Sequence, residues 1–180
     1  MSTDSDYQAA FRRRRDGSRE YEQLVGAFFR ARGFYTVWLP SCGDVPADIP
    51  TVRAPHGHAS IGQPDLLCFR PVEPHKTTWV EVKVKRTLTR DGETGFKTRD
   101  LKDYRLLEDV SGLPVYIVFV HVDRAEVKGA WLSHLTSTVV RTWEGTGRQG
   151  GHYNDPMTYW SYQALPRLCS LQVLEGFRQG

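Results

Sequence analysis

The chain has 180 residues, a mass of 20.6 kDa and a formal net charge of +3, which indicates one globular domain with additional segments. Apolar residues make up 39% and charged residues 25%, a composition that excludes a disordered chain. No apolar run is long enough to cross a bilayer, no signal peptide is visible, and the three scattered cysteines favour the cytoplasm over a disulfide scaffold.

The first 17 residues are polar and include four consecutive arginines: Arg12, Arg13, Arg14 and Arg15. They predict a mobile basic arm, interpreted either as a solvated tail or as a segment that binds phosphate. Ser18 is a typical N-cap, and apolar residues recur after it at helical spacing. The first helix is therefore expected to begin at Ser18 and to end at Gly33, which suits the left-handed position after a helix.

Aromatic and β-branched residues predict strands over 34–39, 66–69, 77–85 and 115–122. Within 77–85 the alternation is regular: Val80, Val82 and Val84 face one way, and Trp79, Glu81, Lys83 and Lys85 face the other. Residues 40–63 are rich in proline and glycine and predict a long loop, and residues 87–97 predict a polar turn or loop. A second helix is expected over 100–110, with Leu101, Tyr104, Leu106 and Leu107 facing inward.

The pattern weakens after residue 123, where it indicates a short helix over 130–140, a glycine-rich loop over 145–151 and a strand over 159–162. The element order α-β-β-β-α-β predicts the α/β class, with a mixed β-sheet flanked by helices and an extra C-terminal segment. The expected division is a mobile basic arm over 1–17, a core over 18–128 and a C-terminal extension over 129–180 that packs on the core.

Three elements of this order carry residues suited to metal chemistry. Asp65 opens one predicted strand, and Glu81 and Lys83 lie on one face of the next strand. If these strands are neighbours, the two carboxylates and the carbonyl of Val82 form a site for Mg²⁺, with Mn²⁺ as a substitute. Lys83 would position the attacking water and stabilise charge on a phosphoryl group, with Glu22 of the first helix assisting. The alternative is that each residue is an ordinary strand or turn residue.

A second metal site is weaker. His56 and His58 lie two residues apart in the long loop, and Cys42 is a candidate third ligand. Sequence signatures of serine hydrolases, P-loop proteins and zinc proteases are absent from the sequence.

The combination of Pro64-Asp65 with Glu81-Val82-Lys83 resembles the PD-(D/E)XK nuclease superfamily. Residues 17–122 are most similar to the archaeal-type Holliday junction resolvases, through the helix glutamate, the Gly33-Phe34 helix end and the Gly112-Leu113-Pro114-Val115 segment. The resemblance implies a restriction-endonuclease-like fold, a homodimer and a Mg²⁺-dependent DNA endonuclease with Glu22, Asp65, Glu81 and Lys83 as catalytic residues. Glu20 is the second choice for the helix glutamate, and Ser41 is a candidate for the serine in the family's short loop.

Two departures from the family concern the substrate. The 40–63 loop and the tail beyond Val122 are both longer than in a minimal resolvase, which leaves a single-strand, flap or restriction-like nuclease as alternatives. A DNA-binding module with a nuclease fold that does not cut is the alternative of another class. Basic residues around the site agree with DNA as the partner, and a solvated surface is their other interpretation. Besides the arginines of the arm, the expected DNA contacts are Lys85, Lys97, Arg99 and Lys102.

Overall fold

The computed structural model describes residues 4–39, 63–72, 76–144, 148–149, 152–153 and 155–179. The helices are α1 Asp4–Arg30, α2 Thr98–Ser111, α3 Leu132–Ser137 and α4 Leu171–Glu175, followed by the 3₁₀ helix η1 Gly176–Gln179. The strands are β1 Tyr35–Trp38, β2 Leu66–Arg70, β3 Lys76–Lys85, β4 Glu93–Lys97, β5 Val115–His121, β6 Glu126–Trp131, β7 Arg141–Trp143, β8 Arg148–Gln149, β9 His152–Tyr153, β10 Met157–Ser161 and β11 Arg167–Ser170.

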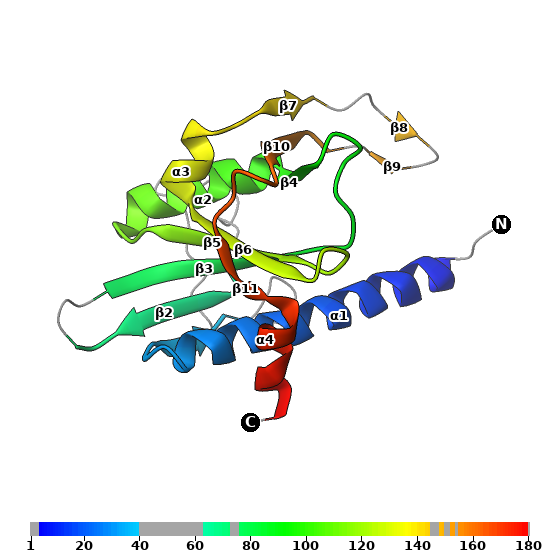
Figure 1. Cartoon of the computed structure of the whole chain (residues 1–180). Coiled ribbons are helices and arrows are strands. Elements are labelled where there is room, and N and C mark those ends of the chain that lie inside the picture. Colours follow the sequence, from blue (N-terminus) through cyan, green and yellow to red (C-terminus); the bar gives the residue numbers. More distant parts are fainter. Residues whose placement is uncertain are drawn as a thin grey trace.

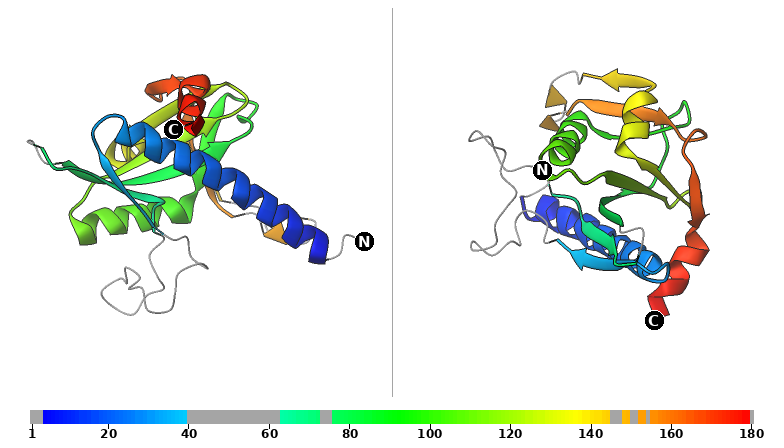
Figure 2. Two further views of the ribbon diagram at one scale, coloured as in Figure 1. Left: turned by 90° about the horizontal axis from the view of Figure 1, so that it is seen from below. Right: turned by 90° about the vertical axis from the view of Figure 1, so that its left-hand side faces the viewer.

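The main sheet has six strands in the order β1-β2-β3-β5-β6-β11 (Figure 1). Strands β3 and β5 are parallel and are joined through α2, whereas the other neighbouring pairs are antiparallel. Helices α1 and α4 cover one face, and α2 and α3 cover the other, where a smaller sheet of β4, β10 and β7 also packs (Figures 1 and 2). The expected mixed sheet flanked by helices is confirmed.

Two cores follow from the alternation along β3. Val80 and Val82 are buried against α1, and Trp79 packs into the core on the α2 side. The central strand β5 is buried on both faces, which explains its continuous run of apolar residues. The opposite faces predicted for β3 are therefore confirmed, and Glu81 and Lys83 lie on the α2 side.

The end of α1 has the geometry of a Schellman motif. The Gly33 N–H donates to the Arg30 carbonyl, and the Phe34 N–H donates to the Phe29 carbonyl. Gly33 has a φ of 81°, which favours glycine, and the rings of Phe29 and Phe34 meet edge to face at 5.7 Å. This confirms Gly33 as the residue that ends the first helix.

The start of α1 corrects the prediction of an irregular arm. The helix begins at Asp4 instead of Ser18, so the backbone of the four arginines Arg12, Arg13, Arg14 and Arg15 is helical. A Cβ added to Gly17 would lie 3.5 Å from an Arg86 nitrogen, so the helix passes close to the end of β3. The arginine side chains lie outside the described part of the chain.

Other sequence-based predictions are wrong where contacts between distant segments determine the structure. Residues 93–97, expected in a loop, form β4 because they pair with β10, and residues 126–131 form β6, which sequence reading missed. The helix expected over 130–140 is the shorter α3, and Leu106 is exposed rather than inward. The segment beyond residue 128 contributes β10 to the small sheet and β11 to the main sheet.

Two regions with sequence-based predictions lie wholly or mostly outside the described residues. Residues 40–62, which include Ser41, Cys42, His56 and His58, lie outside the described residues, as does most of the glycine-rich segment 145–151. No described helix is long and apolar enough to cross a membrane.

Candidate active site

The β2–β3 hairpin brings the two halves of the predicted site together. Leu66 pairs with Val80 at one end of the antiparallel ladder between β2 and β3. Asp65 precedes Leu66 and Glu81 follows Val80, so the two residues lie just beyond this terminal pair. The Val82 N–H donates to Oδ2 of Asp65 over 2.8 Å. The neighbour relation expected for the two strands is therefore present, and a hydrogen bond fixes the Asp65 carboxylate beside β3.

Lys83 lies at the centre of a polar network on the α2 side of the sheet. Its Nζ lies 2.7 Å from Oε1 of Glu81 and 3.0 Å from Oδ2 of Asp100. It also donates to the Tyr104 hydroxyl at 3.2 Å. The negative charge of Glu81 helps to raise the pKa of Tyr104. Strand β3 and helix α2 thus hold the ammonium group between two carboxylates and a phenol.

Unequal charge surrounds Asp65. Burial raises the pKa of Asp65 well above its usual range, and the negative charges of Glu81 and Glu22 raise it further. The Val82 hydrogen bond and the Lys83 charge lower the pKa without overcoming these effects. A cation bound between the two carboxylates would relieve the repulsion that raises the pKa.

At Lys83 the charges of its neighbours together affect the pKa more than burial does. Burial lowers its pKa, but Glu81 and Asp100 together raise it above the usual range of a lysine, so the side chain stays cationic. Lys85 lies two residues further along the same face, and its pKa falls to about 8 through burial and the Lys83 charge. Burial, Glu81 and Asp100 raise the pKa of Tyr104, which therefore keeps its proton.

The structure brings Asp65, Glu81 and Lys83 together at the β2–β3 hairpin, whereas Glu22 is linked to them only through its charge. Glu22 comes from α1 on the far side of the main sheet, and its charge reaches Asp65. Glu20, the second choice, instead pairs with Arg178 at 2.8 Å on the surface. The geometry therefore favours Glu22 as the helix carboxylate of this cluster.

The donor set fits a hard divalent cation. The described residues contain no group of three or more His, Cys, Asp or Glu side chains arranged to hold a metal. Asp65 and Glu81 supply two carboxylates, and the backbone of Val82 points to the β2 side, because its N–H reaches Asp65 and the N–H and carbonyl of a strand residue share a side. Since β2 pairs no further than Leu66, the Val82 carbonyl faces the same open edge. Two carboxylates, one carbonyl and waters are ligands that suit Mg²⁺.

The basic residues predicted to contact DNA are distributed around the start of α2. Arg99 and Lys102 line a cavity of about 200 Å³ there and are exposed. The same cavity is lined by Glu144 and Asp155, and Lys97 forms an ion pair with Asp155 at 2.6 Å. The charge at this end of α2 is therefore mixed, and Arg99 and Lys102 are the more accessible cations.

Sequence reading missed the role of Asp100 and Tyr104 as partners of Lys83. The sequence pattern places Tyr104 on the inward face of the second helix and does not single out Asp100. Their spacing of four residues was the available signal, because residues i and i+4 of a helix lie on one face. With Leu101 and Tyr104 buried on that face, Asp100 also had to point toward the sheet.

Two solved structures are similar to this chain to different degrees. The Archaeoglobus fulgidus protein Hjc, described as a Holliday junction resolvase from an archaeal hyperthermophile, matches with a TM-score of 0.52 and 11% identity over 88% of this chain and 95% of that chain. D212, described as a nuclease from a fusselovirus, matches with a TM-score of 0.43 and 11% identity over 99% of this chain and 96% of that chain. No protein-family model and no curated protein sequence matches this chain.

The chain has the fold of the Hjc nuclease. The match extends over most of both chains. At 11% identity the comparison establishes the architecture alone, and the chemistry of the site rests on the residues described above.

Proposed function

We propose that the protein is a metal-dependent DNA endonuclease of the PD-(D/E)XK superfamily that hydrolyses phosphodiester bonds in branched DNA. The observation that carries this proposal is the cluster of Asp65, Glu81 and Lys83 at the open edge of β3, with the Val82 N–H bonded to Asp65. The Hjc-like fold supports it, because Hjc is described as a Holliday junction resolvase. Mg²⁺ is the proposed cofactor, with Mn²⁺ as a substitute.

Each residue of the cluster has a distinct proposed role. Asp65, Glu81 and the Val82 carbonyl hold the cation, which when bound lowers the pKa of a water and neutralises phosphoryl charge. Lys83 holds the attacking water by donating a hydrogen bond and stabilises the negative charge that develops on the phosphoryl oxygens. Asp100 and Tyr104 fix the direction of the Lys83 side chain. Glu22 orients water at the edge that faces α1.

Cleavage of a set of labelled DNAs tests this function. The set contains a four-way junction, a flap, a plain duplex and a single strand, each with Mg²⁺ or with EDTA. Asp65→Asn is the decisive variant, because its amide oxygen still accepts from the Val82 N–H while the charge is lost. Asp109→Asn, an exposed residue near the end of α2, is the matched control.

The outcomes separate the candidate functions. Metal-dependent cutting by the wild type and by Asp109→Asn, but not by Asp65→Asn, supports the nuclease. Paired symmetric nicks on the four-way junction alone would identify a resolvase and agree with a homodimer, and cutting of the flap or single strand would identify a nuclease of that kind. Retained DNA binding without cutting of any substrate would favour the non-cleaving DNA-binding module instead.

A further inference from the structure

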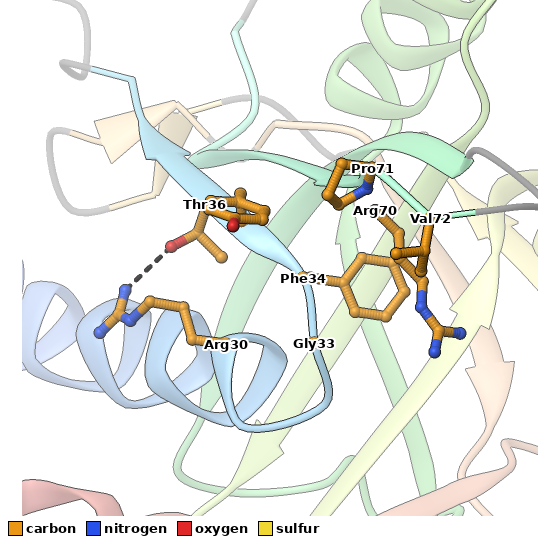
Figure 3. Close-up of a pocket in the computed structure, with 8 residues that line it drawn as sticks. Arg30, Gly33, Phe34, Thr36, Arg70, Pro71 and Val72 are labelled. Carbon is orange, nitrogen blue, oxygen red and sulfur yellow. Dashed lines mark hydrogen bonds between the residues drawn. The ribbon is translucent and has the colours of Figure 1, made fainter.

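An aromatic cleft lies at the end of the main sheet where β3 begins. A cavity of about 850 Å³ is bounded there by the last turns of α1, the start of β3, the α2–β5 connection, β6 and β11. A cavity of about 580 Å³ adjoins it between α1, β1 and the end of β2, and both are lined by Phe34. Figure 3 shows Phe34 between Arg30, which donates to Thr36, and the end of β2. We call the two cavities together the Phe34 cleft.

Aromatic rings form the wall of the Phe34 cleft. Tyr116 meets Trp131 edge to face at 4.8 Å and Phe29 at 6.5 Å. Trp131 is 47% exposed, so part of its ring is open to a ligand. Gly129 fixes the position of Tyr116, because a Cβ there would come within 2.5 Å of the tyrosine hydroxyl. The glycine at position 129 therefore leaves the space on β6 that the Tyr116 ring occupies.

Only one sign of charge lines the Phe34 cleft. Arg32, Lys76 and Arg167 line the larger cavity, and Arg30 and Arg70 line the smaller one. Among the described residues that line either cavity, none is acidic. The pocket at the start of α2 contains two carboxylates by contrast, so the positive charge is a property of this end of the molecule.

Contacts within the protein hold two of these cations in place. The Arg32 guanidinium lies over the Phe28 ring at 3.4 Å, and Arg167 pairs with Glu126 at 3.3 Å. Lys76 is exposed at the first position of β3. A ligand with negative charge would therefore meet oriented guanidinium groups and a mobile ammonium group along an aromatic wall.

We propose that the Phe34 cleft binds an unpaired strand of nucleic acid. Aromatic rings stack on any base, and a groove lined with cations follows the phosphates, which are the two components of single-strand binding. Thr78 lines the cleft three residues before Glu81, which is about 10 Å along β3, but the cleft rings Phe34 and Tyr116 pack on the α1 face of the sheet, whereas Glu81 faces α2. The substrate class is then DNA that has an unpaired segment as well as duplex, such as a flap. This inference rests on the proposed nuclease for the position of the duplex.

Two other occupants fit the cleft less well. A fully paired duplex keeps its bases stacked inside the helix, so it offers phosphates to the cations and no base to the aromatic wall. An acidic peptide with aromatic side chains has the required chemistry, but nothing places such a peptide on this face. The strand is favoured because cations line both adjoining cavities, which matches phosphates that recur along the length of a strand.

Binding of a labelled oligothymidylate in EDTA tests the inference without cleavage. Fluorescence anisotropy should show that Trp131→Ala weakens binding about fivefold or more, while Trp131→Phe keeps most of the affinity. The double variant with Arg70→Gln and Lys76→Gln should also weaken binding and reduce its salt dependence. Both replaced cations are exposed, so this variant keeps the test decisive if Trp131→Ala does not fold. Val140→Ala and Arg124→Gln, which replace exposed residues outside the cleft, are the controls.

Cleavage of paired substrates completes the design. Trp131→Ala should lower the rate on a flap and leave the rate on a fully paired substrate unchanged. Unchanged oligothymidylate binding in both the Trp131 and the double variant would overturn the inference, and so would Trp131-dependent binding of an acidic aromatic peptide without binding of the strand. If Trp131-dependent strand binding is found but no DNA is cut, the nuclease proposal fails and the cleft remains a strand-binding site.

Discussion

Buried carboxylates occur in two regions of this protein, and their surroundings differ. At the candidate site, Asp65 lies near Glu81 and Glu22, and its pKa is raised by burial and like charge. On the small sheet, Glu93 accepts three hydrogen bonds from Arg141 at 2.6–3.1 Å and one from Thr89. Those hydrogen bonds lower the pKa of Glu93.

The difference separates a structural role from a functional one. Glu93 has an oppositely charged partner that matches its two oxygens, so its charge is balanced within the fold. Among the described residues near Asp65, the charges of Glu81 and Glu22 raise its pKa more than Lys83 lowers it, so a bound cation would stabilise the site. Residue type and burial alone would not distinguish the two; the partners do.

The largest expected effect is the loss of cleavage in Asp65→Asn. Because Asp65 is proposed to bind the metal, its replacement should lower the cleavage rate by about 10³-fold or more. The same change removes like-charge repulsion, so the midpoint of urea unfolding without metal should stay the same or rise. Rates on a branched substrate, measured beside the unfolding curves, check both parts. A variant that loses stability and activity together would place Asp65 with Glu93 as a structural residue.

His121 on β5 is a further buried titratable side chain, and its surroundings differ from those of Asp65 and Glu93. Neither ring nitrogen has a hydrogen-bond partner in the described part of the chain, and burial lowers the pKa of His121 to about 4. The unfolded state, with an ordinary pKa of 6.5, binds more protons below that pH. Stability should therefore be lost as pH falls from about 6.5 to about 4, by about 3 kcal/mol.

Comparison with His121→Phe isolates this contribution to the pH dependence. The Phe119 and Tyr162 rings that contact His121 can pack against another aromatic ring, while the titration is removed. Urea unfolding across this pH range should show a smaller loss of stability in the variant than in the wild type. His134→Gln, an exposed histidine, should behave as the wild type does. Equal pH dependence in His121→Phe and the wild type would show that His121 is not responsible.

Tyr104→Phe tests the network around Lys83. The change removes the hydroxyl that accepts a hydrogen bond from Lys83 and keeps the buried ring, so folding should be retained. We expect cleavage to fall about tenfold at saturating Mg²⁺, because Lys83 loses one of the contacts that direct it. Tyr159→Phe on the small sheet is the control. An unchanged rate in Tyr104→Phe would leave Asp100 as the residue that positions Lys83.

The smallest expected effect is that of Glu93→Gln. Arg141 is 43% exposed, so solvent screens its pairing with Glu93, and the melting temperature should fall by a few °C. The cleavage rate of the folded enzyme should not change. Asp155→Asn, which breaks the exposed pair with Lys97, should leave the melting temperature unchanged. If Glu93→Gln lost cleavage without a change in stability, Glu93 would have a role in activity, which would contradict its assignment as a structural carboxylate.

Sequence patterns predicted the parts of the fold that local periodicity determines. The alternation along β3 placed Glu81 and Lys83 on one face, and the apolar residues of β5 predicted a strand. Strand β4 was missed because its polar sequence becomes buried only through pairing with β10, where the Tyr159 ring occupies the space beside Gly95. Strand β6 was missed for a similar reason, since its buried Lys128 donates to the Leu165 carbonyl from a distant segment.

The candidate site shows the same limit. The pairing of Asp65 with Glu81 followed from two short motifs once the strands were assumed to be neighbours. Asp100 contacts Lys83 only because α2 crosses the sheet at one particular angle and height, which residue spacing does not specify. Side-chain partners that depend on packing between elements were therefore missed, whereas those set by one hairpin were found.

The β2–β3 hairpin also has a consequence for the order of folding. Asp65 and Lys83 are close in sequence, and only residues 71–75 connect the two strands. Hairpins of this kind close in about 1–10 μs, whereas the parallel pairing of β3 with β5 requires α2 to form and cross first. The repelling carboxylates therefore meet early, before α2 brings Asp100 and Tyr104 to Lys83. Divalent cations present during refolding should speed the formation of this hairpin before they take part in any cleavage.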